Sequence, residues 1–99
     1  MAWVGSSLET THMKLIKEGK ATEGKIMFYK NMISEGIRII VNFRKVKSHY
    51  ISRHKSEQDP FWKEHYRLRV LIFDQEIKYW TKKNDEFINE IKDLENDQN

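Results

Sequence analysis

The chain of 99 residues contains no cysteine, and this absence excludes several kinds of chemistry. Without thiols there is no disulfide framework, no cysteine nucleophile and no thiolate metal site. No apolar run approaches the roughly 18 residues that a membrane-spanning helix needs, so we expect no membrane span. The N-terminus, MAWVGSSLETTHMK, lacks a basic region followed by an apolar one, which argues against secretion. These features predict an intracellular, soluble protein of the cytoplasm.

Turn-forming residues are also scarce, with four glycines and one proline, which predicts few turns and long elements. The segment 37–43 alternates apolar and polar residues and taken alone would fit a strand. Apolar residues at helical spacing cover a much longer stretch, namely Ile26, Tyr29, Met32, Ile33, Ile37, Ile40, Phe43, Tyr50 and Ile51, with Val46 and His54 extending the same face. Because the helical period persists for about seven turns, it outweighs the short alternation. The sequence predicts a helix over 22–57, with Thr22 as its N-cap.

The segment SEQDPFW contains the clearest boundary signal in the chain. The Asp59 side chain is suited to cap a helix, and Pro60 is suited to the first helical position, where its missing N–H costs nothing. Proline also keeps the preceding residue out of the helical region, so the earlier helix must end before it. We expect the second long helix to cover residues 60–95.

A shorter helix is predicted before the two long ones, over residues 7–18, with Gly19 closing it in the left-handed conformation. Residues 95–99, ENDQN, have the composition of a frayed tail. The predicted fold class is all-α: residues 1–99 form one domain with a short N-terminal helix and two long antiparallel helices, a helical hairpin.

The apolar positions of the last helix cover about half of its circumference, which is more than one partner helix covers. Either the N-terminal helix packs across the pair, or a second copy of the chain completes a four-helix bundle. We favour a homodimer. Its predicted contact residues are Phe73, Ile77, Trp80, Phe87 and Ile91.

The net charge of +3 conceals a strong asymmetry along the chain. Residues 36–73 contain nine Lys and Arg against three acids, whereas residues 74–99 contain four Lys against eight acids. An antiparallel hairpin brings most of the basic residues to the end that contains the turn, between residues 44 and 69. This basic set comprises Arg44, Lys45, Lys47, Arg53, Lys55, Lys63, Arg67 and Arg69, with Tyr50 and Trp62 as nearby aromatics.

Basic residues interleaved with aromatics are suited to neutralising a phosphate backbone and stacking on bases, so DNA or RNA is one candidate partner. The basic residues surround their helix instead of forming one row, which equally fits a solvated hairpin end. An acidic protein or a membrane surface would also match the charge. A further possibility is self-assembly, in which basic ends of one copy meet acidic ends of another.

Catalytic signatures are absent from the sequence: there is no HExxH, GxSxG, P-loop or GxGxxG motif. His49 and His54 are spaced so that they point to different faces of a helix, and His54 and His65 lack a carboxylate at ligand spacing. We therefore name no catalytic, cofactor-binding or metal-binding residues. The Lys-, Glu- and Ile-rich composition is typical of small proteins of viruses, whose location would be the host cell, and also of mobile elements and thermophiles. The sequence predicts a non-enzymatic interaction protein, with nucleic-acid binding through residues 44–69 as the alternative.

Overall fold

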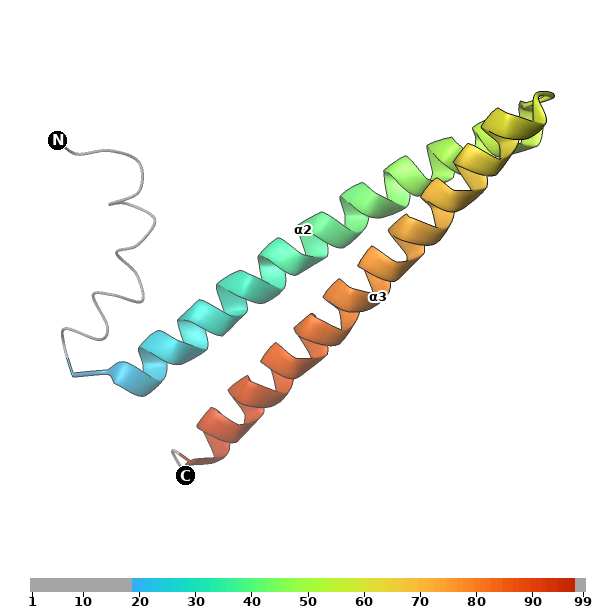
Figure 1. The fold of residues 1–99 in the computed structure, drawn as a ribbon. Coiled ribbons are helices and arrows are strands. Elements are labelled where there is room, and N and C mark those ends of the chain that lie inside the picture. The colour runs from blue at the N-terminus through green and yellow to red at the C-terminus, as the bar shows by residue number, and fades with distance from the viewer. Residues whose placement is uncertain (1–18, 98–99) are drawn as a thin grey trace, which may run out of the picture. The chain divides into compact units, whose positions relative to one another are not determined.

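The computed structural model describes residues 19–97 of the chain. It contains two long helices, α2 over Ala21–Ser56 and α3 over Pro60–Asp97, joined by the short turn 57–59 (Figure 1). All regular structure in the described range is helical, which confirms the predicted all-α helical hairpin and the helical assignment of the alternating segment 37–43. The predicted helix over 7–18 lies outside the described residues.

The start of α2 differs slightly from the prediction. The Gly24 N–H donates to the Lys20 carbonyl at 2.9 Å, so Lys20 accepts the first helical hydrogen bond and occupies the N-cap position. Thr22, the predicted cap, therefore lies inside the first turn. Gly19 has a φ of 78°, the left-handed conformation that glycine adopts without steric cost and that the sequence predicted for it.

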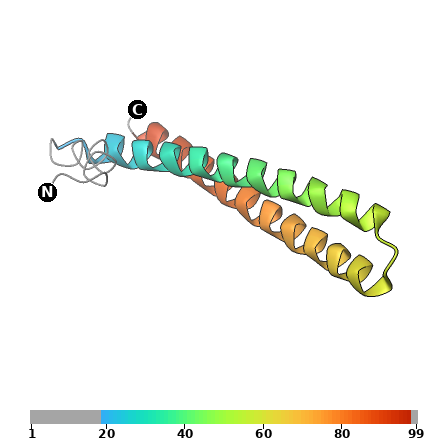
Figure 2. The ribbon, with the colours of Figure 1, turned by 90° about the horizontal axis from the view of Figure 1, so that it is seen from above.

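The turn between the helices is held by side chains that bond to the backbone. The Phe61 N–H donates to Asp59 Oδ1 at 2.8 Å, which is the predicted N-cap, and α3 begins at Pro60 as expected. Glu57 Oε1 accepts hydrogen bonds from the Asp59 N–H at 3.0 Å and from the Gln58 N–H at 3.1 Å. Lys63 donates to the carbonyl of His54 at 2.8 Å, which satisfies an orphan acceptor at the end of α2. Figure 2 shows this short connection from above.

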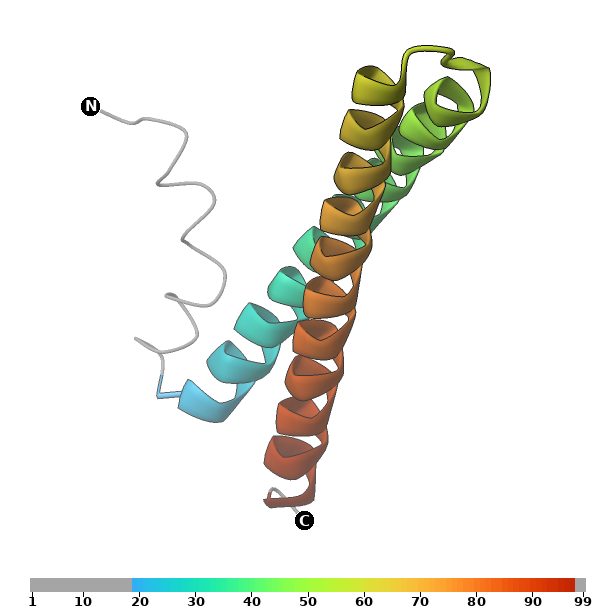
Figure 3. The ribbon, with the colours of Figure 1, turned by 45° about the vertical axis from the view of Figure 1, so that its right-hand side comes forward.

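The chain separates into two compact units, of which residues 35–84 form the turn unit. Within it α2 and α3 lie side by side (Figure 3). They pack along a seam of aromatic rings. The Phe73 ring lies 5.8 Å from that of Phe43 and 5.6 Å from that of Tyr50, and the Tyr50 ring lies 5.9 Å from that of Tyr66. These pairs run in opposite directions along the two helices, so the packing in this unit is antiparallel.

The two helices approach closely where Gly36 faces Asn84 in the turn unit. Both residues are buried, and a Cβ placed on Gly36 would lie 2.9 Å from Cγ of Asn84 and closer still to its Oδ1. Real Cβ atoms do not tolerate such a distance, so the absence of a side chain at this position is what permits the approach.

The second unit, the open-end unit, consists of residues 19–34 and 85–97 within the described range. Its helices pack through the Tyr29 and Phe87 rings, stacked with centroids 5.6 Å apart, and through Ile91, which is 8% exposed. Phe28 packs edge-on against Tyr29 and is 42% exposed.

Two helices alone bury little apolar surface in this hairpin. Among the described residues, Ile40 and Ile91 are the only buried hydrophobic side chains. Ile37 and Val46, which the helical pattern assigned to the buried face, are 54% and 41% exposed, because the seam is narrower than the apolar sector of α2. No helix in the described range contains a stretch long and apolar enough to cross a membrane.

Candidate functional site

The most prominent surface feature of the turn unit is a row of exposed apolar side chains on α3. Phe61 is 70% exposed, Leu68 46%, Ile72 47% and Tyr79 53%. We call these four residues the outer stripe. Soluble proteins commonly expose single apolar side chains, but several large ones on one side of a helix indicate an interaction surface.

The outer stripe lies on the side of α3 that faces away from α2. The residues of α3 that face the seam are Tyr66, Val70, Phe73 and Ile77, all half-buried. At 3.6 residues per turn, the centre of the outer stripe lies about 150° around the helix from the centre of these four residues. In the turn unit α3 therefore has two apolar faces, and α2 covers only one of them.

The five residues predicted for self-association lie in the hairpin as follows. Phe73 contacts Phe43 and Tyr50 across the seam, and Ile77 and Trp80 are half-buried. In the open-end unit Phe87 stacks on Tyr29, and Ile91 is buried. The structure uses these side chains largely within one chain, so we look for a contact surface among the exposed apolar side chains, of which the outer stripe is the row on α3.

Three of the eight predicted basic residues bond to an acidic side chain or to the backbone of the same chain. Lys47 is half-buried and forms an ion pair with Asp74 across the seam. Arg67 Nε donates to Glu64 at 2.9 Å. Hydrogen bonding to Arg67 lowers the pKa of the Glu64 carboxyl below its ordinary value. The third is Lys63, which donates to the His54 carbonyl. Within the described range, the others without a carboxylate partner are Arg44, Lys45, Arg53, Lys55 and Arg69.

The structure brings some of the predicted nucleic-acid residues together in one groove, which we call the aromatic groove. It has a volume of about 310 Å³ and is lined by His49, Tyr50, Arg53, Trp62, His65 and Tyr66. Arg53 Nε donates to Nε2 of His49 at 2.9 Å, and the His65 ring packs edge-on against Trp62 with centroids 5.6 Å apart. No acidic side chain lines the groove, and its aromatic rings and the Arg53 guanidinium are suited to contact a planar or anionic ligand. His49 and His65 were not predicted as members of this site.

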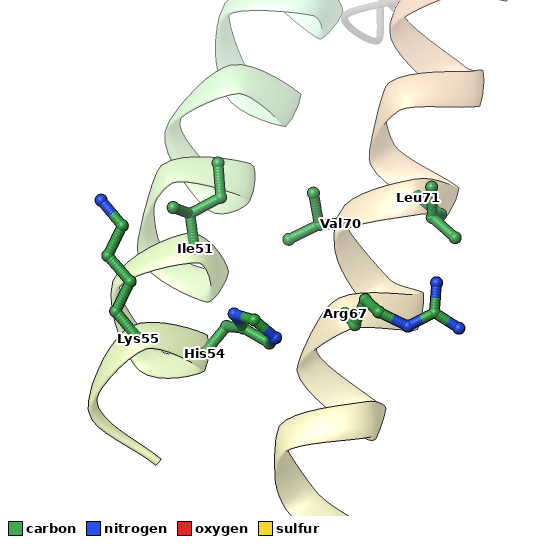
Figure 4. A pocket seen from close by; sticks show the side chains of 6 residues that line it. All are labelled: Ile51, His54, Lys55, Arg67, Val70 and Leu71. Carbon is green, nitrogen blue, oxygen red and sulfur yellow. The ribbon is translucent and has the colours of Figure 1, made fainter.

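Lys55 and Arg67 line a different, mostly apolar groove of about 210 Å³. Figure 4 shows its six residues, with His54 and Val70 extending into the space between the helices and Arg67 extending away from α2. His54 lines this groove and His65 lines the aromatic groove, so the two histidines do not form a common site. Across residues 19–97 the structure forms no group of three His, Cys, Asp or Glu side chains that is suited to hold a metal ion.

The predicted basic end is therefore two grooves with separate residues, and not one continuous surface. Arg44, Lys45 and Arg69 line neither groove. Comparison of the chain with models of protein families, with curated proteins and with solved structures finds no match in any of the three.

Proposed function

We propose that this protein is a non-enzymatic helical interaction protein that acts through self-association of its hairpin. The observation that carries the proposal is the outer stripe, four large apolar side chains between 46% and 70% exposed on the face of α3 that α2 leaves uncovered. Its spacing along one helix favours another helix as the partner, since helices pack through such rows.

The energetics favour covering this surface. Complete burial of one such side chain is worth about 1.5–3 kcal/mol, so a partner that covers the outer stripe gains several kcal/mol before the cost of association is subtracted. The hairpin itself buries few apolar side chains, and small helical proteins commonly compensate for a thin core by oligomerisation. Self-association would stabilise the fold and form the assembly at the same time.

Introducing charges into the outer stripe tests the proposal directly. We expect the double substitution Leu68→Glu and Ile72→Glu to shift the protein from dimer to monomer in sedimentation velocity at tens of micromolar. Val41→Glu with Val46→Glu is the matched control, because these valines are 43% and 41% exposed on α2 and lie outside the stripe. A dimer that survives the first pair of substitutions, or an unaltered protein that sediments as a monomer, would refute the proposal.

Nucleic-acid binding is the second candidate function, and the aromatic groove is the observation that favours it. Arg53, Trp62 and the two tyrosines provide a cation and stacking surfaces with no carboxylate among the lining residues. The other basic residues are divided between faces, and Lys47 and Arg67 already have acidic partners, which weakens any long-range attraction for a phosphate backbone.

A gel-shift series separates this candidate from self-association. If the groove binds single strands, Arg53→Glu should lower the affinity and flatten the salt dependence by about one phosphate contact, whereas Lys45→Glu, outside the groove, should change it less. The absence of a shift at about 50 mM salt with micromolar protein would eliminate nucleic-acid binding, because nonspecific binders have Kd values of about 10⁻⁴–10⁻⁶ M even at physiological salt.

A further inference from the structure

The outer stripe of α3 has a symmetry that identifies its partner and the direction in which the partner lies. Phe61 and Tyr79 are each nine residues from Val70, and Leu68 and Ile72 are each two residues from it. The spacing of these large apolar residues is therefore the same whether the helix is followed from its N-terminus or from its C-terminus. A helix with this property is complementary to a second copy of itself running in the opposite direction.

The positions between these residues complete a coiled-coil pattern. The sequence positions 61, 65, 68, 72, 75 and 79 are separated by alternating steps of four and three residues, the spacing that keeps a row of side chains on one side of a helix. His65 and Gln75, the two polar members, are also equidistant from Val70. We propose that two copies of α3 pair in antiparallel orientation about Val70, an inference that rests on the proposed self-association and specifies its partner, direction and register.

This register brings six layers of side chains together along about 27 Å of helix, at about 1.5 Å per residue. Phe61 of one copy packs against Tyr79 of the other at both ends, and Leu68 packs against Ile72 on both sides of the centre. His65 then meets Gln75 of the second copy in each intermediate layer. A polar pair at such positions disfavours other registers, because any shift would leave these groups opposite apolar side chains.

Charged residues beside the stripe are consistent with this register, with one exception. Glu64 lies on the same side of the interface as Lys78 of the second copy, offset by about 3 Å along the helix, and Leu71, which is 45% exposed, lies near its own counterpart at the two-fold axis. Glu76 of the second copy lies on the same side as Trp62, offset by about 3 Å along the helix, at the edge of the aromatic groove, which no acid of this chain lines. The exception is Arg69, which lies opposite Arg69 of the second copy.

A different register would follow from charge alone, with the basic turn of one copy against the acidic 85–97 segment of the other. Exposed ion pairs are each worth only about 0–1 kcal/mol. That register would leave the aromatic ends of the outer stripe without apolar partners. Burial of the stripe therefore decides the alignment, and the charges modulate it.

Because the protein has no cysteine, single introduced thiols report the register without interference. We would prepare His65→Cys and Gln75→Cys, treat each alone and in an equimolar mixture with a short thiol–thiol cross-linker, and identify the products by intact mass. The antiparallel register predicts that the cross-linked heterodimer in the mixture exceeds the cross-linked homodimers at least tenfold. Lys82→Cys mixed with His65→Cys is the control, since residue 82 continues the row but lies seven residues, or about 10.5 Å, beyond residue 75.

The two proposals fail in distinguishable ways. If the protein sediments as a dimer and Gln75→Cys cross-links to itself in the absence of His65→Cys, the two copies are parallel. This result would overturn the inference and leave self-association intact. Dimers that give no preferred cross-linked pair would likewise overturn the register. A monomer by sedimentation at tens of micromolar overturns both, because the antiparallel pair is a form of the proposed dimer.

Discussion

The two faces of α3 in the turn unit have similar apolar content but opposite environments. The seam side is covered by α2, so Phe73 and Tyr66 have aromatic partners on the neighbouring helix. The outer side carries an equally large set of apolar side chains, yet Phe61 and Tyr79 remain more than half exposed. The comparison shows that one partner helix covers only part of an apolar arc this wide, and that the remainder is a surface for association.

The largest effect should come from removing the outer stripe. Leu68→Glu with Ile72→Glu places two charges in the centre of the proposed interface, and each lost apolar contact is worth about 1.5–3 kcal/mol. We expect the dimer Kd to rise at least 100-fold, since every 1.4 kcal/mol is a factor of ten. Sedimentation equilibrium measures the Kd, and an equal rise for Val41→Glu with Val46→Glu would mean that the stripe has no special role.

The next effect concerns the seam side. Phe73→Ala removes contacts to both Phe43 and Tyr50, so we expect the free energy of unfolding to fall by about 3 kcal/mol. Chemical denaturation at several protein concentrations separates the two faces. The loss from Phe73→Ala should persist on dilution, whereas the loss from Ile72→Ala should fade as the protein dissociates. A concentration-dependent loss for Phe73→Ala would place Phe73 in the interface between copies.

A smaller change tests how closely the helices meet along the seam. Alanine normally stabilises a helix interior by about 0.5–1 kcal/mol relative to glycine, but a Cβ on Gly36 would lie 2.9 Å from Cγ of Asn84. We therefore expect Gly36→Ala to lower the unfolding free energy by about 1–3 kcal/mol, the usual cost of overpacking. In an Asn84→Ala background the same substitution should be neutral or stabilising. Thermal unfolding of the four proteins completes the cycle, and destabilisation in both backgrounds would contradict the close contact.

The smallest expected effect returns to the outer side and to the like-charged pair at the proposed two-fold axis. A mixture of the unaltered protein with Arg69→Glu should form heterodimers in excess of the statistical share, because each Arg69 then faces a glutamate. The pair is exposed, so its contribution is about 0.2–1 kcal/mol, and it should vanish at high salt. Native mass spectrometry counts the three species. A statistical mixture at low salt would be inconsistent with Arg69 lying at the axis.

The helices and their boundaries could be predicted from the sequence, because they depend on neighbouring residues. The exposure of individual side chains could not, because it depends on how the two helices pack against each other. Asp59 and Pro60 define the start of α3 by capping and by steric exclusion, which are properties of neighbouring residues. The helical period likewise predicted α2 through the alternating segment 37–43. The exposure of Ile37 and Val46 could not be predicted in this way, because it depends on how wide a strip of α2 its neighbour covers.

The candidate sites show the same division. The sequence indicated which residues are basic, but the pairing of Lys47 with Asp74 requires the register of the two helices. His49 and His65 join the aromatic groove because their positions place them on the same side of the hairpin, a relation that no single-helix pattern contains. The symmetric spacing about Val70 was present in the sequence. Its meaning depended on knowing which face α2 leaves open.

Sedimentation velocity of the unaltered protein over a range from about one to 100 micromolar tests self-association most directly. We expect a concentration-dependent shift from one chain of 12.0 kDa to a dimer, since the proposed contact covers fewer than three heptads of helix. The same series with Leu68→Glu and Ile72→Glu should show a single chain throughout. A single chain at every concentration of the unaltered protein would contradict the assignment of the outer stripe as a self-association surface.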